Sequence, residues 1–176
     1  MTGSALWATA GTTAGNNALS RAEAFFNGSS ALLNDSVVIS HLDDDDYWEP
    51  YHLQTLADRY ALYPSARFVY TRARGCHRAE GFPGFETDGL NNLPPTPAMI
   101  IHSSASWKMN EFRGFRYQQR AEMAHVQAGD ADMWARMTRH MQTNKKDYSF
   151  VPKATLIHGG EDGGKDCVPI PDACAP

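Results

Sequence analysis

Four consecutive aspartates, Asp43 to Asp46, are the residues of this chain with the clearest capacity for chemistry. They directly follow residues 37–42, Val-Val-Ile-Ser-His-Leu, a β-branched run with the length of a buried strand. Adjacent carboxylates repel one another, and this repulsion is costly at the end of a strand unless a cation neutralises it. Mg²⁺ and Mn²⁺ prefer oxygen ligands and often share them with the phosphates of a substrate. The run therefore predicts a site for a divalent cation and a phosphate-containing ligand.

The alternation of side chains along an extended strand gives this site a first geometry. It places Asp43 and Asp45 on one side of the chain, with Asp44 and Asp46 on the other. Ligands also favour the carboxyl ends of strands in open α/β sheets. The alternative is a solvated acidic turn that binds nothing. The aspartates directly follow the predicted strand, and a tryptophan and a proline come shortly after them. This context favours the metal site over the solvated turn.

The rest of the sequence predicts strands that alternate with helices. Strands are expected at residues 37–42, 67–71, 98–102 and within 148–158, and helices at 18–26, 50–61, 116–127 and 130–141. A long loop rich in glycine and proline is expected at residues 72–97. Such alternation favours an α/β sheet that helices cover on both faces.

Composition excludes several classes of protein. The 176 residues, 42% of them hydrophobic and 20% charged, are typical of one globular domain. The net charge of −4 and the absence of a lysine- or arginine-rich block argue against a nucleic-acid partner. No run of residues approaches the roughly 18 apolar residues of a membrane span. The N-terminus makes a poor signal peptide, and three cysteines make no disulfide framework, so we expect a cytoplasmic protein.

The segment from Val38 to Leu53 resembles the Asp-x-Asp segment of inverting GT-A glycosyltransferases of the family 2 type. In that family a hydrophobic strand precedes Leu-Asp-x-Asp-Asp, an aromatic residue, a proline and a helix that begins near His-Leu. The resemblance implies a partial GT-A fold, with a mixed, mostly parallel sheet flanked by helices. It also implies that Asp43 and Asp45 serve the ribose, the diphosphate and a Mn²⁺ or Mg²⁺ ion, with Asp46 close by. The whole four-aspartate run would then bind the nucleotide-sugar donor.

A second segment, Gly129 to Met137, resembles the family's Glu-Asp-x-x-Leu-Trp-x-Arg motif. By this resemblance Asp130 is the catalytic base and Arg136 is its companion on the helix. Gly129 stands where the family commonly has glutamate. The alternative is that Asp130 only caps the helix by accepting a hydrogen bond from its first turn. The two roles are compatible, because a base fixed at a helix start is well positioned.

Two further segments carry predictions by resemblance. Residues 100–108 resemble the strand that leads to the acceptor side, where we place Ser103, Trp107 and Trp134, although the serines suit any turn equally well. The strand that ends at His158 resembles a late strand whose histidine some members bring back to the metal. His158 is therefore predicted as a third metal ligand beside Asp43 and Asp45, the alternative being an ordinary histidine at a strand end.

The resemblance covers residues 11–160, and it leads to a division of the chain. We expect a flexible lead-in at 1–16, a partial glycosyltransferase domain at 17–160 and a tail rich in glycine and proline at 161–176. Ala14 to Leu19 stands for the family's Ala-Arg-Asn helix, and we expect the β-α units that hold the donor's base to be missing. The isolated chain should then bind UDP and GDP weakly and unselectively, show no measurable transfer, and self-associate.

These observations predict a metal-dependent, inverting glycosyltransferase, in truncated form. It would transfer a hexosyl group from a nucleotide-sugar to a hydroxyl of a glycan, lipid or protein acceptor. The cation would neutralise the departing diphosphate, and Asp130 would take the acceptor's proton in a single displacement. Two alternatives remain open. One is a non-catalytic nucleotide- or sugar-binding remnant. The other is a metal-dependent phosphoryl hydrolase. Such an enzyme would require further metal ligands, and the sequence offers only His158 and the aspartates as candidates.

Overall fold

The structure is a computed structural model, and it describes residues 12–30, 35–75, 81–82, 88–91, 93–95, 100–118 and 129–159. The helices are α2 (Thr12–Phe26), α4 (His52–Leu62), α5 (Gly129–Thr143) and the short 3₁₀ helix η1 (His102–Ser104). The strands are β1 (Val38–Ser40), β2 (Tyr47–Trp48), β3 (Ala66–Gly75), β4 (Gly81–Phe82), β5 (Gly89–Leu90), β6 (Ala105–Lys108) and β7 (Asp147–His158). The tail 161–176, residues 1–11 of the lead-in, most of the predicted helix 116–127 and the cysteines lie outside the described residues.

The strands form one curled, mixed sheet in the order β1-β6-β3-β7-β2, with β4 added to β3 and β5 to β7. Among the described strands only β3 and β7 pair in parallel, and the other five pairings are antiparallel. The predicted mixed sheet flanked by helices is confirmed, but the expectation of mostly parallel strands is wrong. Parallel neighbours need a long crossover connection, and α5 lies within the one that joins β3 to β7.

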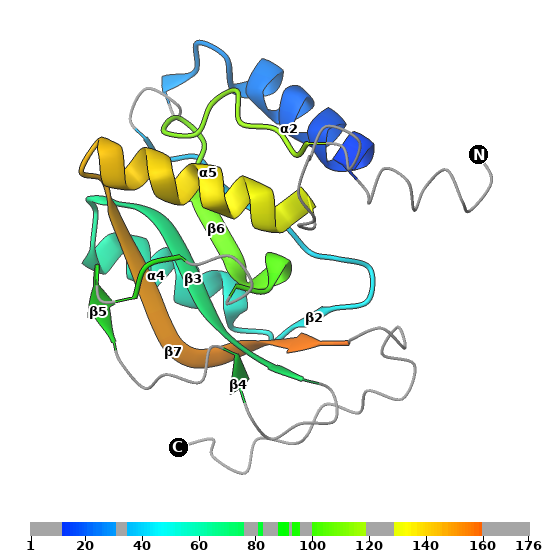
Figure 1. The fold of residues 1–176 in the computed structure, drawn as a ribbon, viewed down its shortest axis with the longest axis vertical. Helices are drawn as coiled ribbons and strands as arrows, with labels where there is room; N and C mark the ends of the chain where they lie inside the picture. Colours follow the sequence, from blue (N-terminus) through cyan, green and yellow to red (C-terminus); the bar gives the residue numbers. More distant parts are fainter. Residues whose placement is uncertain are drawn as a thin grey trace, which may run out of the picture.

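Helices cover the two faces of the sheet, as Figure 1 shows for α5 and α4. Successive side chains of β3 point to opposite faces, so Phe68 and Tyr70 pack toward α5 while Val69 packs toward Leu56 of α4. In the larger core cluster, α5 contributes Met133, Trp134, Met137 and Met141. Within the described residues, no helix combines the length and the apolar character that crossing a membrane requires.

Several predicted elements need correction. The strand predicted at 98–102 does not form over residues 100–102, because η1 begins at His102 and β6 begins only at Ala105, while residues 98 and 99 lie outside the described residues. The backbone N–H and the hydroxyl of Ser104 both donate to the carbonyl of Ile101, at 2.9 and 2.7 Å, and these local bonds close a turn in place of a strand. The helix α2 begins at Thr12, earlier than predicted. The long loop predicted at 72–97 includes the end of β3 and the short strands β4 and β5.

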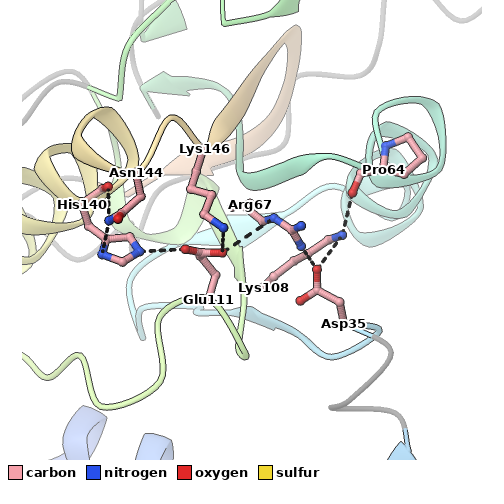
Figure 2. A network of polar contacts seen from close by, with 8 residues as sticks. All are labelled: Asp35, Pro64, Arg67, Lys108, Glu111, His140, Asn144 and Lys146. Carbon is pink, nitrogen blue, oxygen red and sulfur yellow. Dashed lines mark hydrogen bonds and ion pairs between the residues drawn. The ribbon is translucent and has the colours of Figure 1, made fainter.

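An ion-pair network lies at the end of the sheet where β3 begins (Figure 2). The carboxylate of Glu111 accepts from His140 Nε2 at 2.7 Å and pairs with Lys146 Nζ at 3.3 Å. Asp35 pairs with Arg67 and with Lys108, whose Nζ lies 3.4 Å from Asp35 Oδ2. Burial of Glu111 opposes its ionisation, but the bonds from His140 and Lys146 outweigh burial and lower its pKa. We call these six residues the ion-pair network.

Candidate functional site

The four aspartates form a tight turn between β1 and β2. The backbone N–H of Asp46 donates to the carbonyl of Asp43 at 3.3 Å. Asp44 at the tip is exposed, Asp46 is buried, and Asp43 and Asp45 are half-buried. The expected alternation of an extended chain is therefore wrong here, because the chain reverses direction within the run. The four carboxylates consequently occupy environments that differ strongly.

Asp43 is held from two sides by η1. Its Oδ1 lies 2.8 Å from His102 Nδ1, and its backbone N–H donates to the Ser103 hydroxyl at 2.9 Å. Burial opposes ionisation of Asp43, but its interactions with nearby histidines, first of all the hydrogen bond from His102, outweigh burial and lower the pKa of Asp43. The side chain remains 41% exposed, so its carboxylate is ionised and accessible to a ligand.

Asp46 is a buried carboxylate that is bonded on one oxygen. Its Oδ1 lies 2.7 Å from His158 Nδ1 and accepts from the backbone N–H of Gly159 at 3.1 Å. Its Oδ2 has no hydrogen-bond partner in the part of the chain that the structure describes. The hydrogen bond to Asp46 raises the pKa of His158, against the opposing effect of burial. The end of β7 is thereby tied to the aspartate turn.

Asp45 shows that the turn holds more negative charge than its own contacts neutralise. Burial raises the pKa of Asp45, and the neighbouring charges of Asp46 and Asp43 raise it further. In the part of the chain that is described, no group of three His, Cys, Asp or Glu residues is arranged to hold a metal ion. Mg²⁺ is usually held by one or two carboxylates together with substrate phosphates. The uncompensated carboxylates of the turn fit an ion of that kind.

Asp43 is also the end of a chain of aromatic side chains. His102 Nε2 lies 2.7 Å from the Tyr117 hydroxyl, and that hydroxyl lies 2.9 Å from His41 Nδ1. Burial lowers the pKa of His41 to about 4, and the nearby His102 contributes to this shift. The side-chain amide of Asn16 on α2 accepts from the backbone N–H of Tyr117 and donates to its carbonyl, both at 2.8 Å.

Asp130 lies in the first turn of α5, where acidic side chains stabilise a helix. It is the second residue of that helix, so it stands inside the helix and not at the capping position before it. Burial raises the pKa of Tyr117, and the charges of Asp43 and Asp130 both add to this shift. The charge of Asp130 therefore acts on the same hydroxyl that His102 joins to Asp43. Its predicted companion Arg136 pairs instead with Asp132, at 2.7 Å.

The three residues predicted for the acceptor side are buried. The exposed fraction is 0% for Ser103, 2% for Trp107 and 1% for Trp134. Ser103 supports the aspartate turn, since its hydroxyl accepts from Asp43 and its carbonyl accepts from Trp48 Nε1 at 2.8 Å. Neither tryptophan ring presents an open stacking face in this structure, and their acceptor role stays a prediction.

Sequence reasoning gave no site role to His41, His102 or Tyr117, and it considered Asn16 only as the residue that replaces the arginine of the family's Ala-Arg-Asn helix. The histidines show no spacing typical of metal ligands, and Tyr117 falls in a segment expected to be helical. The one signal in the sequence was position, because His102 is the last residue and His41 the last but one of a segment predicted to be a strand. Side chains at the ends of strands often meet at a ligand site in α/β sheets.

Comparison with known proteins relates most of the chain to a named enzyme class. The chain is 30% identical over 171 residues to a protein of Acanthamoeba polyphaga mimivirus that is named an uncharacterized glycosyltransferase. The match takes in 93% of this chain and 65% of the viral protein, so the chain spans just under two thirds of that relative's length. No family model matches the chain.

Proposed function

We propose that this chain carries the donor site and the catalytic base of a metal-dependent, inverting GT-A glycosyltransferase of the family 2 type. The observation that carries the proposal is the aspartate turn, which gathers four carboxylates and leaves the Oδ2 atom of Asp46 without a partner among the described residues. Asp43, from the aspartate turn, and Asp130, from the start of α5, both influence the hydroxyl of Tyr117. The similarity to a viral protein named as a glycosyltransferase supports the same class of reaction.

The donor would bind at the aspartate turn through its diphosphate. Asp43 and Asp45 would hold Mn²⁺ or Mg²⁺, and the phosphates would supply further oxygen ligands. His158 would offer its Nε2 only after the site rearranges around the ion, because its Nδ1 is engaged by Asp46 and no three such residues are arranged for a metal in the described part of the chain. The exposed Asp44 would remain for the hydroxyl groups of the ribose or sugar. A bound divalent ion would neutralise the charge that develops on the departing diphosphate.

The chain's own residues would carry the proton in the transfer step. The acceptor hydroxyl oxygen attacks the anomeric carbon while the bond from that carbon to the diphosphate oxygen breaks. The electron pair of the broken bond leaves with the diphosphate, and the hydroxyl proton passes to the carboxylate of Asp130. A single displacement of this kind inverts the configuration at the anomeric carbon.

A calorimetric titration of UDP in the presence of Mn²⁺ tests the donor site. Asp45→Asn removes one ionised carboxylate with little change of shape, and we expect it to weaken metal-dependent UDP binding by more than about tenfold. Asp58→Asn is the matched control. Asp58 lies exposed on α4, where it accepts from Gln54 at 2.7 Å, and its substitution should leave binding unchanged.

Three outcomes separate the candidate functions. Equal UDP binding by Asp45→Asn and the wild-type chain would contradict the metal and donor assignment. Metal-dependent binding without transfer from any nucleotide-sugar would favour the non-catalytic remnant. Release of phosphate from the nucleotide, without transfer of a sugar, would favour the phosphoryl hydrolase.

A further inference from the structure

Three aromatic side chains form a series of hydrogen-bond contacts that leads from Asp43 into the interior of the protein. His102 joins Asp43 to Tyr117, and Tyr117 joins His102 to His41, with contacts of 2.8, 2.7 and 2.9 Å. The three rings come from three segments: the residue after β1, the start of η1 and the loop that follows β6. They pack edge to face or tilted, with ring centroids 4.7 to 5.6 Å apart.

The hydrogen-bond chemistry gives this chain a direction. An ionised Asp43 only accepts, so Nδ1 of His102 must carry a proton. In a neutral His102 the Nε2 atom then accepts, which makes the Tyr117 hydroxyl the donor. The oxygen of that hydroxyl accepts in turn from His41, whose Nδ1 must also carry a proton. Every donor along the chain therefore points toward the carboxylate of Asp43.

We propose that His41, Tyr117 and His102 form a one-directional chain of hydrogen-bond donors that positions the Asp43 carboxylate for a metal-bound diphosphate. This inference rests on the proposed function, and it assigns positioning residues to the same site. Hydrogen bonds in a chain of this kind polarise and strengthen one another at low local dielectric. Fixing Asp43 in one rotamer also avoids an ordering cost when the ligand binds.

The surrounding structure holds the middle of the chain in place. The side-chain amide of Asn16 fixes the backbone of Tyr117 through two hydrogen bonds. Gly15 leaves room for the ring, because a Cβ atom at that position would lie 3.0 Å from Tyr117 Cε2. At the far end the ring of His41 packs against Trp107 with the centroids 4.9 Å apart. Tyr117 is thus positioned by α2, an element remote from the aspartates in sequence.

The first test needs no ligand. Long-range ¹H–¹⁵N NMR correlation on the full 176-residue chain reports which ring nitrogen of each histidine is protonated. We expect His102 and His41 to carry protons on Nδ1, and we expect His102 to change its spectrum in Tyr117→Phe. A His102 that carries a proton on Nε2, in a neutral or a doubly protonated ring, could not accept from the Tyr117 hydroxyl and would overturn the inference, whatever the chain binds.

The second test measures UDP affinity with Mn²⁺ well below the melting temperature. Tyr117→Phe keeps the ring and removes the hydroxyl, and we expect about a tenfold loss of affinity. Tyr70→Phe is the matched control, since Tyr70 is also buried and its hydroxyl donates to the Leu93 carbonyl at 3.1 Å. Both variants lose one hydroxyl and some stability, but only Tyr117→Phe should lose affinity. Equal affinities would overturn the inference.

Two substitutions of His102 localise the effect. Asn places its amide nitrogen near the position of Nδ1 and keeps the contact with Asp43, while Gln reaches the position of Nε2 and keeps only the contact with Tyr117. We expect His102→Asn to retain more UDP affinity than His102→Gln, and the opposite order would contradict the inference. If the wild-type chain binds no UDP while both histidines carry protons on Nδ1, the donor chain stands and the proposed function fails.

Discussion

The ion-pair network and the aspartate turn lie at opposite ends of β1, β6 and α5, and their carboxylates have different partners. In the ion-pair network, Glu111 and Asp35 face arginine, lysine and histidine side chains (Figure 2). In the aspartate turn, histidines are the only basic side chains that pair with Asp43 and Asp46 among the described residues, and the Oδ2 atom of Asp46 has no partner there. The same strands and the same helix therefore join a compensated end to an end with excess negative charge.

The difference separates charge that stabilises the fold from charge that serves a ligand. A carboxylate with cationic partners has a lowered pKa, as Glu111 does. A carboxylate that is partly buried among like charges has a raised pKa, as Asp45 does, and that arrangement is unfavourable until a cation binds. Perturbed carboxylates of the second kind gather at functional sites.

The largest effect should come from the base. Asp130→Asn should lower the turnover of an active protein by about 10²- to 10⁴-fold, because Asn cannot take a proton from the acceptor. Its nucleotide affinity should remain close to that of the wild-type chain, since the group acts mainly in the transition state. Steady-state transfer assays and UDP titration measure the two quantities.

Asp132→Asn is the control for that substitution, because Asp132 lies in the same first turn of α5 and pairs with Arg136. It should cost only the stability of one helical ion pair, about 0.3–0.5 kcal/mol, and leave turnover intact. Near-normal turnover in Asp130→Asn would show that Asp130 is not the catalytic base, and the proposed functional role of this end of α5 would then be wrong.

The ion-pair network should respond in stability and not in binding. Glu111→Gln removes the carboxylate that His140 and Lys146 share, and we expect urea denaturation to give a loss of about 1–3 kcal/mol. Asp58→Asn, on the exposed face of α4, should change stability by less than about 0.5 kcal/mol. A Glu111→Gln chain that keeps its stability but loses UDP affinity would invert the roles of the two ends.

The two ends should also differ in the pH at which they lose stability. The pKa of Glu111 is lowered from 4.5, so its contribution is present above pH 4.5 and is lost as the pH falls through its folded-state pKa. The pKa of His158 is raised from 6.5, so its contribution is present below pH 6.5 and is lost as the pH rises through its folded-state pKa.

Urea denaturation at several pH values, with a chelator present, measures these contributions. The stability advantage of the wild-type chain over Glu111→Gln should shrink in acid, and its advantage over His158→Gln should shrink in base. Parallel pH profiles for the two variants would show that the ends do not differ in this respect.

The smallest effect concerns the packing behind Tyr117. Gly15→Ala should gain up to about 1 kcal/mol of helix propensity, but its new methyl group would press on the Tyr117 ring. We expect little net change in melting temperature and a loss of UDP affinity of a few fold. Asn17→Ala, at an exposed position of the same helix, should raise stability and leave affinity unchanged. Unchanged affinity in both variants would mean that Tyr117 tolerates displacement.

Much of the fold was predictable because its elements have strong local patterns. The β-branched run before the aspartates, the helical spacing from Leu53 to Tyr60 and the apolar stripe of α5 predicted β1, α4 and α5 within a few residues. The strand predicted at 98–102 failed over residues 100–102 because the Ser104 side chain bonds the nearby backbone of Ile101, which a count of apolar residues does not register. The prediction of mostly parallel strands failed because the relative direction of two paired strands depends on how the chain connects them, which local patterns do not specify.

The candidate site was predictable at the level of its motifs but not of its contacts. The aspartate run and Asp130 stand out in the sequence by composition and resemblance. The contacts of Asp43 with His102, and of His102 with Tyr117, join residues that no spacing rule relates. Only the arrangement of η1, β1 and the loop after β6 brings these side chains together.

The anchoring of the segment after the aspartates has a consequence for the entropy of binding. Trp48 donates to the Ser103 carbonyl, the backbone N–H of Glu49 donates to the Thr155 carbonyl at 3.0 Å, and the Glu49 carboxylate pairs with Arg74. Fixing the backbone of one residue costs about 1–2 kcal/mol, and these contacts place that cost in the folding of the chain. A ligand that arrives at the aspartate turn meets a loop that is already ordered, so more of its contact energy remains as affinity.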